Sequence, residues 1–520
     1  MAIWEMFSKA VAGYPDKIGV VNGEGSCTYR ELNTRIQALG GFFRSCGIKA
    51  GDRISILDYN SLPFYEAYFA AAGIGAILNP LNYRLSANEL YFIINDAGSK
   101  WLIANSEFHN QVIALLQTKT CLHGIIWISG KPDIEIESES HDYNEVVTSQ
   151  SEFTPAIVTP ADIAHLYYTS GTTGKPKGVI LNHNNVCRHA EGAVKEFALS
   201  EKDRWGHIAP MFHLADAWAV FAITMVGGCH VIQPGFDALK TLALIEDENI
   251  TISNLIPTML NLMVKHPRVH EFDLSSLRVM LSGGAPIAQE VVRNIMQVFG
   301  CDYIQTYGMT ETSPYLTLSI LKDHLRALPP EDQFRYKAKT GRPFITVDLK
   351  VVTEEGTEIT PDDEEAGEIW VKGETITPGY WNLPEETETA FSDGWLKTSD
   401  LATIDGEGYV NIVDRKKDMI ISGGENIYSI EVENVLYQHP QVLEAAVFGL
   451  PDEIWGEIVT AAIVLRPGES VSDAEIIEFC DDKIAGFKIP RSIFFIEELP
   501  KTGSGKIRKR ELAVKYSTKK

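Results

Sequence analysis

The sequence predicts an α/β fold. A large N-terminal domain, made of two subdomains with helices layered on sheets plus a small β subdomain, is followed by a small, mobile α+β C-terminal domain. Three observations lead to this prediction: helical patterns alternate with short apolar runs over most of the chain, a stretch of short strands and glycine-rich turns follows, and helices and strands then mix again. Strands separated by helices are typical of βαβ units, whose sheets are mainly parallel.

The two layered subdomains are predicted from an alternation that begins at Tyr29. The run "YRELNTRIQALGGFFRSCG" has a helical pattern, and "RISILDYN" and "WLIANS" have the length and composition of strands. The alternation continues through "CHVIQPG", "TISNLIP", "LRVMLSGGAP" and "DYIQTYGMTE". Before it, "MAIWEMFSKAVAGYPDK" indicates the start of a helix with early charges rather than a signal peptide.

The β subdomain and the C-terminal domain are predicted from a change of texture. Between about Pro343 and Val413, short strands, glycine-rich turns and acidic loops dominate, as in "EEAGEIWVKG". A charge cluster at Asp414 to Asp418 then precedes helices at "SIEVENVLYQH" and "DAEIIEFCDDKI" and strands at "EAAVFG" and "IVTAAIVL". We therefore predict two domains, residues 1–416 and 417–520.

Composition excludes several classes of protein. Of 520 residues, 45% are hydrophobic and 22% are charged, as in ordinary globular enzymes, and the net charge of −24 disfavours contacts with nucleic-acid phosphates. The seven cysteines are scattered without a C-x-x-C pair, so neither a disulfide framework nor a zinc site is expected. The longest apolar run, "WAVFAITMVGG", falls short of the ~18 residues that span a bilayer. We expect a cytoplasmic protein without a transmembrane segment, a lipid tag or a nucleic-acid partner, and leave its oligomeric state open.

The stretch "YYTSGTTGKPKGV", Tyr167 to Val179, is predicted to hold phosphate. Glycines let backbone N–H groups approach an anion, and hydroxyl and ammonium groups add donors. The signature G-x-x-x-x-G-K-[ST] does not fit, because Pro176 stands where the magnesium-binding hydroxyl would be. The flanking runs "IAHLYY" and "VILNH" have the length of strands, so a loop between two strands is expected, with a plain surface turn as the alternative.

Five separated stretches need a common explanation. They are Thr169–Gly178 "TSGTTGKPKG", Ser282–Pro286 "SGGAP", Tyr307–Glu311 "YGMTE", Trp395–Asp400 "WLKTSD" and Pro500–Arg510 "PKTGSGKIRKR". With "VDRKKDMIISGGENI" between the last two, they resemble in order and spacing the motifs of the adenylate-forming superfamily, which includes acyl- and aryl-CoA synthetases, adenylation domains of peptide synthetases and beetle luciferases. The resemblance covers nearly the whole chain.

The resemblance implies a reaction in two steps. In this family a carboxylate attacks the α phosphorus of ATP, giving an acyl-AMP and pyrophosphate, and a thiol then displaces AMP. The implied cofactors and co-substrates are ATP, Mg²⁺ and coenzyme A. The phosphate loop would hold the β and γ phosphates so that they leave together.

The nucleotide site is carried over from the family residue by residue. Asp400 is expected to accept hydrogen bonds from both ribose hydroxyls, and Arg415 to donate to ribose or phosphate oxygens. Tyr307 would cover the adenine opposite "SGGAP", and Thr310 would donate to the α phosphate. The full set of predicted ATP and AMP contacts is Thr169, Ser170, Gly171, Thr172, Thr173, Gly174, Lys175, Lys177, Gly283, Gly284, Ala285, Pro286, Tyr307, Gly308, Met309, Thr310, Asp400, Arg415 and Lys506.

Catalysis needs positive charge where two anions meet. By resemblance Lys506 reaches the attacking carboxylate and the α phosphate, with Lys501 as a second basic group nearby. Glu311 is the predicted magnesium ligand, because Mg²⁺ prefers few carboxylates plus phosphate oxygens. The predicted catalytic residues are Lys506, Thr310, Glu311 and His213. The alternatives are a solvated basic tail for "KIRKR", a core aromatic for Tyr307 and a turn residue for Asp400.

The second step is expected to follow a rotation of the C-terminal domain about a hinge at Lys417. The rotation would bring "SGGEN" to the active site, where its glycines let a pantetheine chain pass. Predicted contacts with coenzyme A are Ser422, Gly423, Gly424, Trp455, Arg84 and Lys488. Related enzymes often have a basic residue where Ile489 stands, so the grip on the coenzyme A phosphates is left open.

The segment "PMFHLADAWAVF", Pro210 to Phe221, is expected to line the pocket for the acid. His213 matches a gate beside the carboxylate, with a structural histidine as the alternative. The predicted acyl-pocket residues are His213, Asp216, Trp218, Phe221, Met309 and Pro314, which would form an apolar wall apart from Asp216. An unpaired buried carboxylate is costly, so Asp216 raises the alternative of an amino-acid substrate whose ammonium group it would pair with.

The sequence therefore predicts an AMP-forming acyl-CoA synthetase for a medium-chain, aromatic or alicyclic carboxylate. Its direction is not encoded, and the reaction is open to reversal. The alternative is a stand-alone adenylating enzyme that loads an acyl or aminoacyl group onto a carrier protein, against which no carrier segment follows Lys520. A non-catalytic scaffold would have lost Lys506 or Glu311, and both are present.

Overall fold

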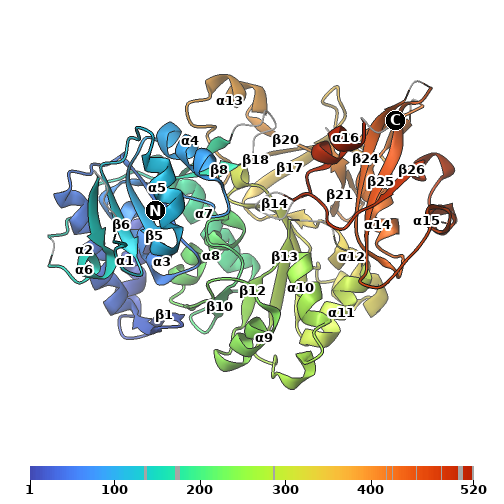
Figure 1. The fold of residues 1–520 in the computed structure, drawn as a ribbon. Helices are drawn as coiled ribbons and strands as arrows, with labels where there is room; N and C mark the ends of the chain where they lie inside the picture. The colour runs from blue at the N-terminus through green and yellow to red at the C-terminus, as the bar shows by residue number, and fades with distance from the viewer. Residues whose placement is uncertain are drawn as a thin grey trace.

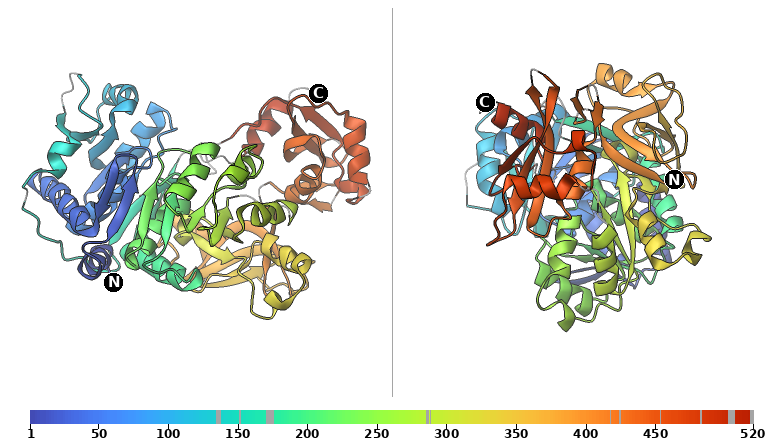
Figure 2. Two further views of the ribbon diagram at one scale, coloured as in Figure 1. Left: turned by 90° about the horizontal axis from the view of Figure 1, so that it is seen from below. Right: turned by 90° about the vertical axis from the view of Figure 1, so that its right-hand side faces the viewer.

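The protein is described by a computed structural model that covers residues 1–133, 138–150, 152–169, 176–284, 287, 289–416, 418–423, 425–452, 454–481, 483–501 and 507–517. The predicted α/β architecture is confirmed: helices flank two large sheets, and a smaller β unit and a small C-terminal unit follow (Figure 1). The C-terminal unit lies at the opposite end of the molecule from the first subdomain, as the left view of Figure 2 shows.

The first subdomain is built on a largely parallel sheet. Its strands, in spatial order among the described residues, are β7 (Glu139–Asp142), β6 (Gly124–Ile128), β5 (Ser99–Asn105), β3 (Arg53–Leu57), β4 (Ile77–Pro80), β8 (Ile163–Thr169) and β9 (Lys177–Asn182). The last pair, β8 and β9, is antiparallel. The accompanying helices are α2 (Tyr29–Ser45), α3 (Leu62–Ile74), α4 (Ala87–Ala97), α5 (His109–Leu116) and α6 (Tyr143–Val147).

The second subdomain contains the sheet with the most strands among the described residues. Its strands, in spatial order, are β16 (Arg342–Pro343), β15 (Tyr315–Leu318), β14 (Asp302–Gly308), β13 (Val279–Gly283), β12 (Ile252–Asn254), β10 (Arg204–His207), β11 (Cys229–Ile232), β1 (Ile18–Asn22) and β2 (Gly25–Thr28). The N-terminal hairpin β1–β2 thus joins a sheet whose other strands come much later in the chain, which the sequence did not indicate. The helices are α1 (Ile3–Gly13), α7 (His183–Glu196), α8 (Leu214–Met225), α9 (Ala238–Asp247), α10 (Pro257–Val264), α11 (Gln289–Phe299) and α12 (Pro330–Ala338).

The two remaining units are smaller. The β unit is antiparallel and contains β17 (Val347–Val352), β18 (Gly367–Gly373), β19 (Phe391–Ser392), β20 (Trp395–Ile404), β21 (Val410–Arg415) and helix α13 (Pro384–Ala390). The C-terminal unit contains β22 (Ile420–Ser422), β23 (Glu425–Ile427), β24 (Val442–Asp452), β25 (Gly456–Leu465), β26 (Ser492–Phe495), α14 (Ser429–Leu436), α15 (Asp473–Asp481) and α16 (Lys509–Ser517). The predicted boundary between residues 416 and 417 falls between β21 and β22, which belong to different sheets.

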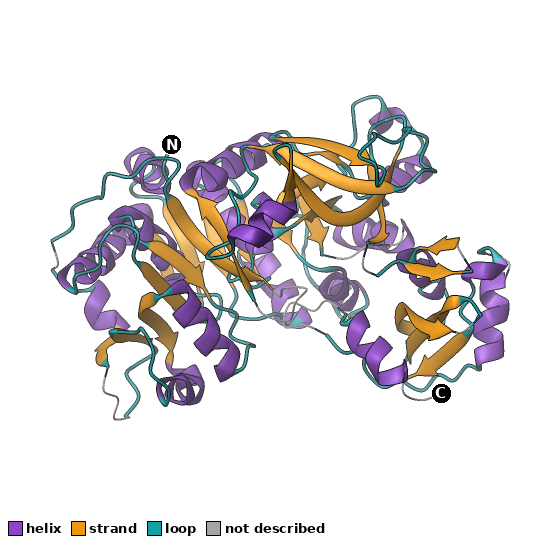
Figure 3. Cartoon of the chain, turned by 90° about the horizontal axis from the view of Figure 1, so that it is seen from above, coloured by secondary structure: helices purple, strands orange, loops and turns teal. Residues whose placement is uncertain are grey.

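Local sequence explains where the helices form and how deep they lie. At the start of α2, the Thr28 hydroxyl accepts from the Glu31 amide while the Glu31 carboxylate accepts from the Thr28 amide, which satisfies two N–H groups that a helix start leaves unpaired. Helices α3 and α8 are apolar on all sides, and nearly every residue of both is buried. Both belong to the largest core, which spans the two subdomains, so that helices lie between as well as outside the sheets (Figure 3).

Two further observations concern thiols and membranes. All seven cysteines are free thiols in the structure. None of the described helices is both long and apolar enough to cross a bilayer.

Neutral histidines in the core are expected to make stability depend on pH. His189 of α7 is buried against the rings of Trp218, Tyr315 and Phe344, and burial lowers its pKa to about 3. An unfolded histidine titrates near ~6.5, so the native state binds fewer protons below that pH. The stability that the neutral ring contributes is therefore fully present above the unfolded pKa and is lost as the pH falls.

The variant His189→Gln keeps an acceptor but cannot titrate. Between pH 7 and pH 5 we expect it to lose about 2 kcal/mol less unfolding free energy than the wild type. Urea unfolding of both proteins at the two pH values measures the difference. Equal losses would show that His189 is protonated in the native state or does not contribute.

Candidate active site

The strands that flank the phosphate-loop motif form the antiparallel hairpin β8–β9, in which Thr169 pairs with Lys177. The carbonyl of Gly178 accepts from the amide of Trp381 at 2.7 Å, so a segment of the β unit lies along β9. The Lys177 ammonium lies 5.4 Å from the centre of the Tyr380 ring. The remaining predicted contacts of this loop lie outside the described residues and stay predictions: Ser170, Gly171, Thr172, Thr173, Gly174 and Lys175.

Three predicted nucleotide-binding residues meet at one carboxylate. Asp400 accepts from the Tyr307 hydroxyl at 2.6 Å through one oxygen and from Arg415 Nε at 3.0 Å through the other. The register of β20 and β21 sets Asp400 opposite Arg415, whereas Tyr307 comes from β14 of the other sheet. Burial and then the adjacent Asp400 charge raise the pKa of Tyr307 well above its ordinary value, so its hydroxyl stays a donor. The result is a buried, charged acceptor held by two donors, which suits the neighbouring hydroxyls of a ribose.

The strands around this carboxylate approach so closely that two positions exclude a side chain. A Cβ on Gly283 would stand 2.4 Å from Thr306 Oγ1, and one on Gly308 would stand 1.8 Å from the carbonyl oxygen of Pro314. These glycines are therefore needed by the packing of β13, β14 and the segment before β15. Gly284 has a left-handed backbone (φ 86°), while Ala285 and Pro286 lie outside the described residues.

Glu311, the predicted magnesium ligand, lies in the short helix η3 (Thr310–Thr312) directly after β14, with Thr310 partly exposed beside it. Its carboxylate accepts from the Tyr380 hydroxyl at 2.9 Å, and its carbonyl accepts from the Thr377 amide at 2.7 Å. Burial and the Glu311 charge raise the pKa of Tyr380 far above its ordinary value. Tyr380 was not among the residues predicted from the sequence. The motif "PGYW" shows an aromatic after a glycine, but nothing in it indicates a contact with Glu311.

The surroundings of the Glu311 carboxylate show whether it suits Mg²⁺ as a ligand. It offers one nearly buried carboxylate, oriented by a neutral tyrosine, at the end of the strand that carries Tyr307. A single carboxylate fits an ion that takes most of its ligands from substrate phosphates and water. The donor set therefore fits Mg²⁺ in the presence of a nucleotide.

The predicted acid segment divides into a loop and a buried helix. His213 is partly exposed directly before α8, and its ring centre lies 4.4 Å from that of Phe212. Trp218 and Phe221 lie inside α8 and are each 1% exposed, so neither borders a space that holds water. Trp218 packs against Trp205 and Tyr315, and Phe221 against Tyr68 and His165. In this structure both are core residues, and their part in an acyl pocket stays a prediction.

Asp216 requires a correction. It is fully buried, but it is not unpaired: one oxygen accepts from Trp205 Nε1 at 3.1 Å and the other pairs with His207 Nδ1 at 2.5 Å. His207 Nε2 in turn lies 2.9 Å from His230 Nδ1. Because core groups already pair with both oxygens, Asp216 has no need of a substrate ammonium, and the argument for an amino-acid substrate loses its basis.

Met309 and Pro314 are brought together after the end of β14. The Met309 amide donates to the Pro314 carbonyl at 3.1 Å and to Thr312 Oγ1 at 3.1 Å. Met309 is partly exposed, whereas Pro314 is buried. These two predicted acyl-pocket residues therefore lie beside each other and next to the Tyr307 strand.

The predicted contacts with coenzyme A are divided between the first subdomain and the C-terminal unit. Arg84 is exposed, with its guanidinium 5.3 Å from the Tyr83 ring and 5.9 Å from the Phe212 ring. Gly423 has a left-handed backbone and donates to the Trp455 carbonyl at 2.8 Å, and Ser422 beside it is buried. Gly424 lies outside the described residues.

Basic residues near Trp455 are not equally available. Lys488 Nζ pairs with both carboxylate oxygens of Glu431, at 2.7 and 2.8 Å, and Ile489 is buried in the core of the unit. Arg491, which sequence analysis passed over, is exposed and lies 4.1 Å above the ring of Trp455, itself 40% exposed. Both residues lie in the segment between η5 (Gly486–Lys488) and β26, where Ile489 is buried and Arg491 is exposed.

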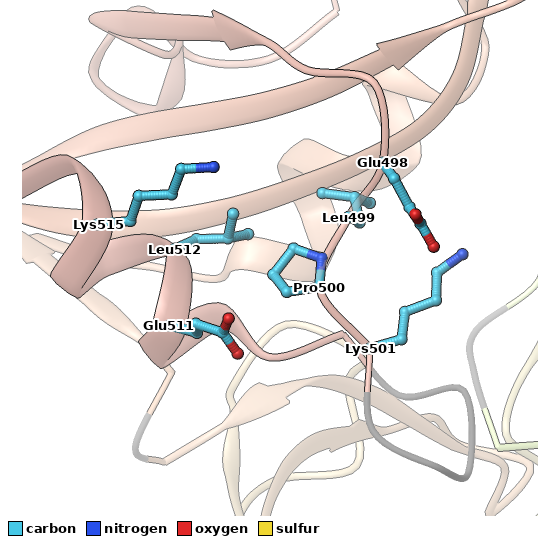
Figure 4. Close-up of a pocket in the computed structure, with 7 residues that line it drawn as sticks. All are labelled: Glu498, Leu499, Pro500, Lys501, Glu511, Leu512 and Lys515. Carbon is cyan, nitrogen blue, oxygen red and sulfur yellow. The ribbon is translucent and has the colours of Figure 1, made fainter. Parts of the chain in front are cut away.

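Lys506 and the hinge residue Lys417 lie outside the described residues, and their roles stay predictions. Lys501 is described: its ammonium pairs with Glu444 at 2.6 Å. It also borders a cavity of about 270 Å³ between α16 and the segment before it, where Leu512 faces Leu499 and Pro500 (Figure 4). The lining residues all belong to the C-terminal unit, so this cavity is separate from the Asp400 cluster.

Comparison with known proteins places these features in a family. The family model described as AMP-binding enzyme matches residues 7–381, and the one described as AMP-binding enzyme C-terminal domain matches residues 431–506. A feruloyl-CoA synthase of Amycolatopsis sp is 35% identical over 503 residues, which cover 96% of either chain. A long-chain-fatty-acid–CoA ligase of Mycobacterium tuberculosis is 36% identical over 94% of this chain and 93% of that protein. The solved structure of an o-succinylbenzoate CoA synthetase of Bacillus subtilis, in complex with its acyl-adenylate intermediate, superposes with a TM-score of 0.85 at 29% identity over 98% of both chains.

Proposed function

The chain belongs to the AMP-binding enzyme family, and from this premise we propose that the protein is an AMP-forming acyl-CoA synthetase, an acid–thiol ligase. The observation that carries the proposal is the meeting of Tyr307, Asp400 and Arg415 from two sheets, with Glu311 four residues after Tyr307 in the chain. The relatives support it, because their names are those of CoA synthetases and ligases over nearly the whole length of the chain.

In the first step a carboxylate oxygen of the acid forms a bond to the α phosphorus of ATP, and the bond from that phosphorus to the oxygen of pyrophosphate breaks. Asp400 holds the ribose, and Arg415 completes the grip on ribose or phosphate. Lys506 neutralises the carboxylate and the α phosphate as their charges meet, with Thr310 as a hydroxyl donor. Glu311 would hold Mg²⁺, which when bound would supply positive charge to the leaving phosphates.

In the second step the sulfur of coenzyme A forms a bond to the acyl carbon, AMP leaves with the electron pair of the broken acyl–oxygen bond, and the thiol proton passes to solvent. The C-terminal domain rotates about Lys417 between the steps, which removes Lys506 and brings Gly423 and Gly424 to the site. Ser422 and Gly423 then line the path of the thiol arm, while Arg84 and Trp455 lie toward the nucleotide end.

The substrate is a hydrophobic carboxylate of medium-chain, aromatic or alicyclic type. Supporting this class, several described residues near the predicted acid segment are apolar, as with Met309, Pro314 and Phe212, and the names of the relatives include aromatic and fatty acids. His213, directly before α8, is the polar group that meets the substrate carboxylate. The free thiols of all seven cysteines support placement in the cytoplasm.

Arg491 is expected to grip the phosphates of coenzyme A. It is exposed above the Trp455 ring, whereas Lys488 is already paired with Glu431. Arg491→Ala should raise the KM for coenzyme A roughly tenfold, the loss of one charge-assisted contact of 1.5 kcal/mol or slightly more. Lys488→Ala is the matched control and should raise this KM less. If the lysine variant has the larger effect, the ion pair with Glu431 opens on binding and the assignment is wrong.

The test of the proposed function is pyrophosphate release from ATP and Mg²⁺ with benzoate, cyclohexanecarboxylate, hexanoate, decanoate or an amino acid, each with and without coenzyme A. Sustained turnover with a hydrophobic acid only when coenzyme A is present supports the synthetase and identifies its acyl class. Release that is indifferent to coenzyme A supports the alternative, transfer of the acyl group to a carrier protein. No release with any acid refutes the proposal.

A further inference from the structure

The loop that leads into the acid segment is held from the neighbouring subdomain by one side chain. Asn60 follows β3 in the first sheet, while the loop at residues 208–213 joins β10 to α8 in the second. The Asn60 amide nitrogen donates to the carbonyls of His207 (3.1 Å) and Ala209 (2.8 Å), and its oxygen accepts from the Met211 amide at 2.7 Å. Asn60 is 3% exposed, so these are buried hydrogen bonds.

An asparagine side chain is well suited to this task. It carries two N–H donors and an acceptor in one plane, and here it uses both functions on alternate residues of the loop. The Ala209 and Met211 groups lie beyond the regular ladder of β10, where buried carbonyls and amides still need partners, whereas the His207 carbonyl ends that strand and also accepts from the Gln233 amide at 3.1 Å. A second side chain of the first subdomain adds to the grip, because the Tyr68 hydroxyl donates to the Met211 carbonyl at 2.9 Å. Met211, two residues before His213, is therefore held through both its amide and its carbonyl.

Asn60 is itself firmly placed. Next to it, buried Asp58 accepts from the Asn105 amide at 2.8 Å and from the Ser61 hydroxyl at 2.5 Å. The Ser61 oxygen accepts from the Phe64 amide at the start of α3. Asp58 follows β3, and Asn105 is the last residue of the adjacent strand β5. The connections of these two strands leave in opposite directions, toward β4 and β6. Ligands of open α/β sheets bind at such a switch point, where the carboxyl ends of two strands diverge.

The loop is also held from its own subdomain. The His207 ring pairs with Asp216 of α8, so the residue whose carbonyl Asn60 binds is fixed through its side chain as well. The segment between these anchors contains Pro210, Met211 and Phe212 and ends at His213. Its conformation is therefore set before substrate arrives, which is what a group that must meet a carboxylate at a defined distance requires.

We propose that Asn60 is a positioning residue for the acid-binding step, which acts by holding the loop at residues 208–213 so that His213 meets the substrate carboxylate. The proposal rests on the proposed function, because it assumes that His213 faces an acid. The proposal gives the first subdomain a part in recognising the acid. The side chain of Asn60, from that subdomain, contacts only backbone groups of the loop and its flanking strand.

Asn60→Ala tests the proposal in the full-length enzyme. The KM for the acid is expected to rise roughly 10- to 100-fold, the range that follows from a small misplacement of a binding group, while the KM for ATP stays near that of the wild type. Hydrogen exchange at the Met211 amide is expected to become faster. Tyr68→Phe, which removes the second anchor but keeps the ring, is expected to act in the same direction and more weakly, and it carries the test if Asn60→Ala does not fold.

Asn79→Ala is the matched control. Asn79 is 0% exposed, lies within β4 of the same sheet and donates to the Ser55 hydroxyl at 3.0 Å. Asn79→Ala should lower the stability of the protein, but it should not raise the KM for the acid relative to the KM for ATP. In a double-mutant cycle, Asn60→Ala should add little to His213→Ala, because both act on one contact.

Three results overturn the proposal. The first two are equal rises in the KM for the acid and for ATP, and kinetics that match those of Asn79→Ala. Additive effects of Asn60→Ala and His213→Ala also overturn it. These failures are distinct from failure of the proposed function, in which the wild type itself releases no pyrophosphate with any acid.

Discussion

Lys506→Ala is expected to slow adenylation by roughly 10²–10³-fold, the usual effect of removing one donor that acts on the transition state. Formation of the thioester from acyl-AMP supplied directly is expected to survive. The reason is the proposed rotation about Lys417, which removes Lys506 from the site before the thiol attacks. Pyrophosphate release in single turnover measures the first step, and coenzyme A consumption with preformed acyl-AMP measures the second.

Lys501→Ala is the matched control for Lys506→Ala. Lys501 belongs to the same basic motif, but its ammonium is paired with Glu444 at 2.6 Å. Removing it should therefore change adenylation much less. Equal losses in both half reactions of Lys506→Ala would refute the rotation, and equal effects of the two lysine variants would show that general positive charge, and not a placed donor, is what the step uses.

Asp400→Asn is expected to reduce kcat/KM for ATP roughly 10²-fold, which corresponds to weakening two hydrogen bonds from ribose hydroxyls to a charged acceptor. The same change removes the charge that faces Arg415 Nε at 3.0 Å and turns an acceptor of Tyr307 into an amide. The nucleotide loses its ribose anchor and the two donors lose their common partner. Initial rates at varied ATP, with the acid saturating, measure the effect.

The control for Asp400→Asn lies at the end of the same hairpin. Asp405, between β20 and β21, pairs with Lys339 at 2.7 Å, so Asp405→Asn breaks an ion pair away from the Asp400 cluster. It should lower stability and leave the KM for ATP unchanged. If Asp400→Asn instead raised the KM for the acid and left that for ATP unchanged, the assignment of Asp400 to the ribose would be wrong.

Sequence patterns were most informative where the signal is local. Helical patterns and short apolar runs predicted α2, α14 and the strands β8 and β9 that flank the phosphate loop, all of which are present. Asp400 and Arg415 were both expected at the nucleotide from the family resemblance, and the structure places them opposite each other in neighbouring strands. The motif spacing also indicated the family, which the matches over residues 7–381 and 431–506 confirm.

Partners from distant parts of the chain could not be predicted. The Asp216 carboxylate was expected to be unpaired, because the sequence does not show that Trp205 and His207 of β10 face it across the core. Trp218 and Phe221 have the composition of a pocket wall, yet the packing of α8 between the two sheets turns both into core residues. The hydrophobicity of a residue says that it is buried, but not whether a substrate or another side chain covers it.

The sequence by itself determined the types of elements, the order of the motifs and the kinds of chemical group that the site contains, because these depend on residue type and on spacing along the chain. The tertiary structure alone decided which groups act together: Tyr307 with Asp400, Tyr380 with Glu311, and Asn60 with the loop before His213. The physical reason is that hydrogen bonds act over about 3 Å, and only the packing of separate sheets against shared helices brings such distant residues within that range.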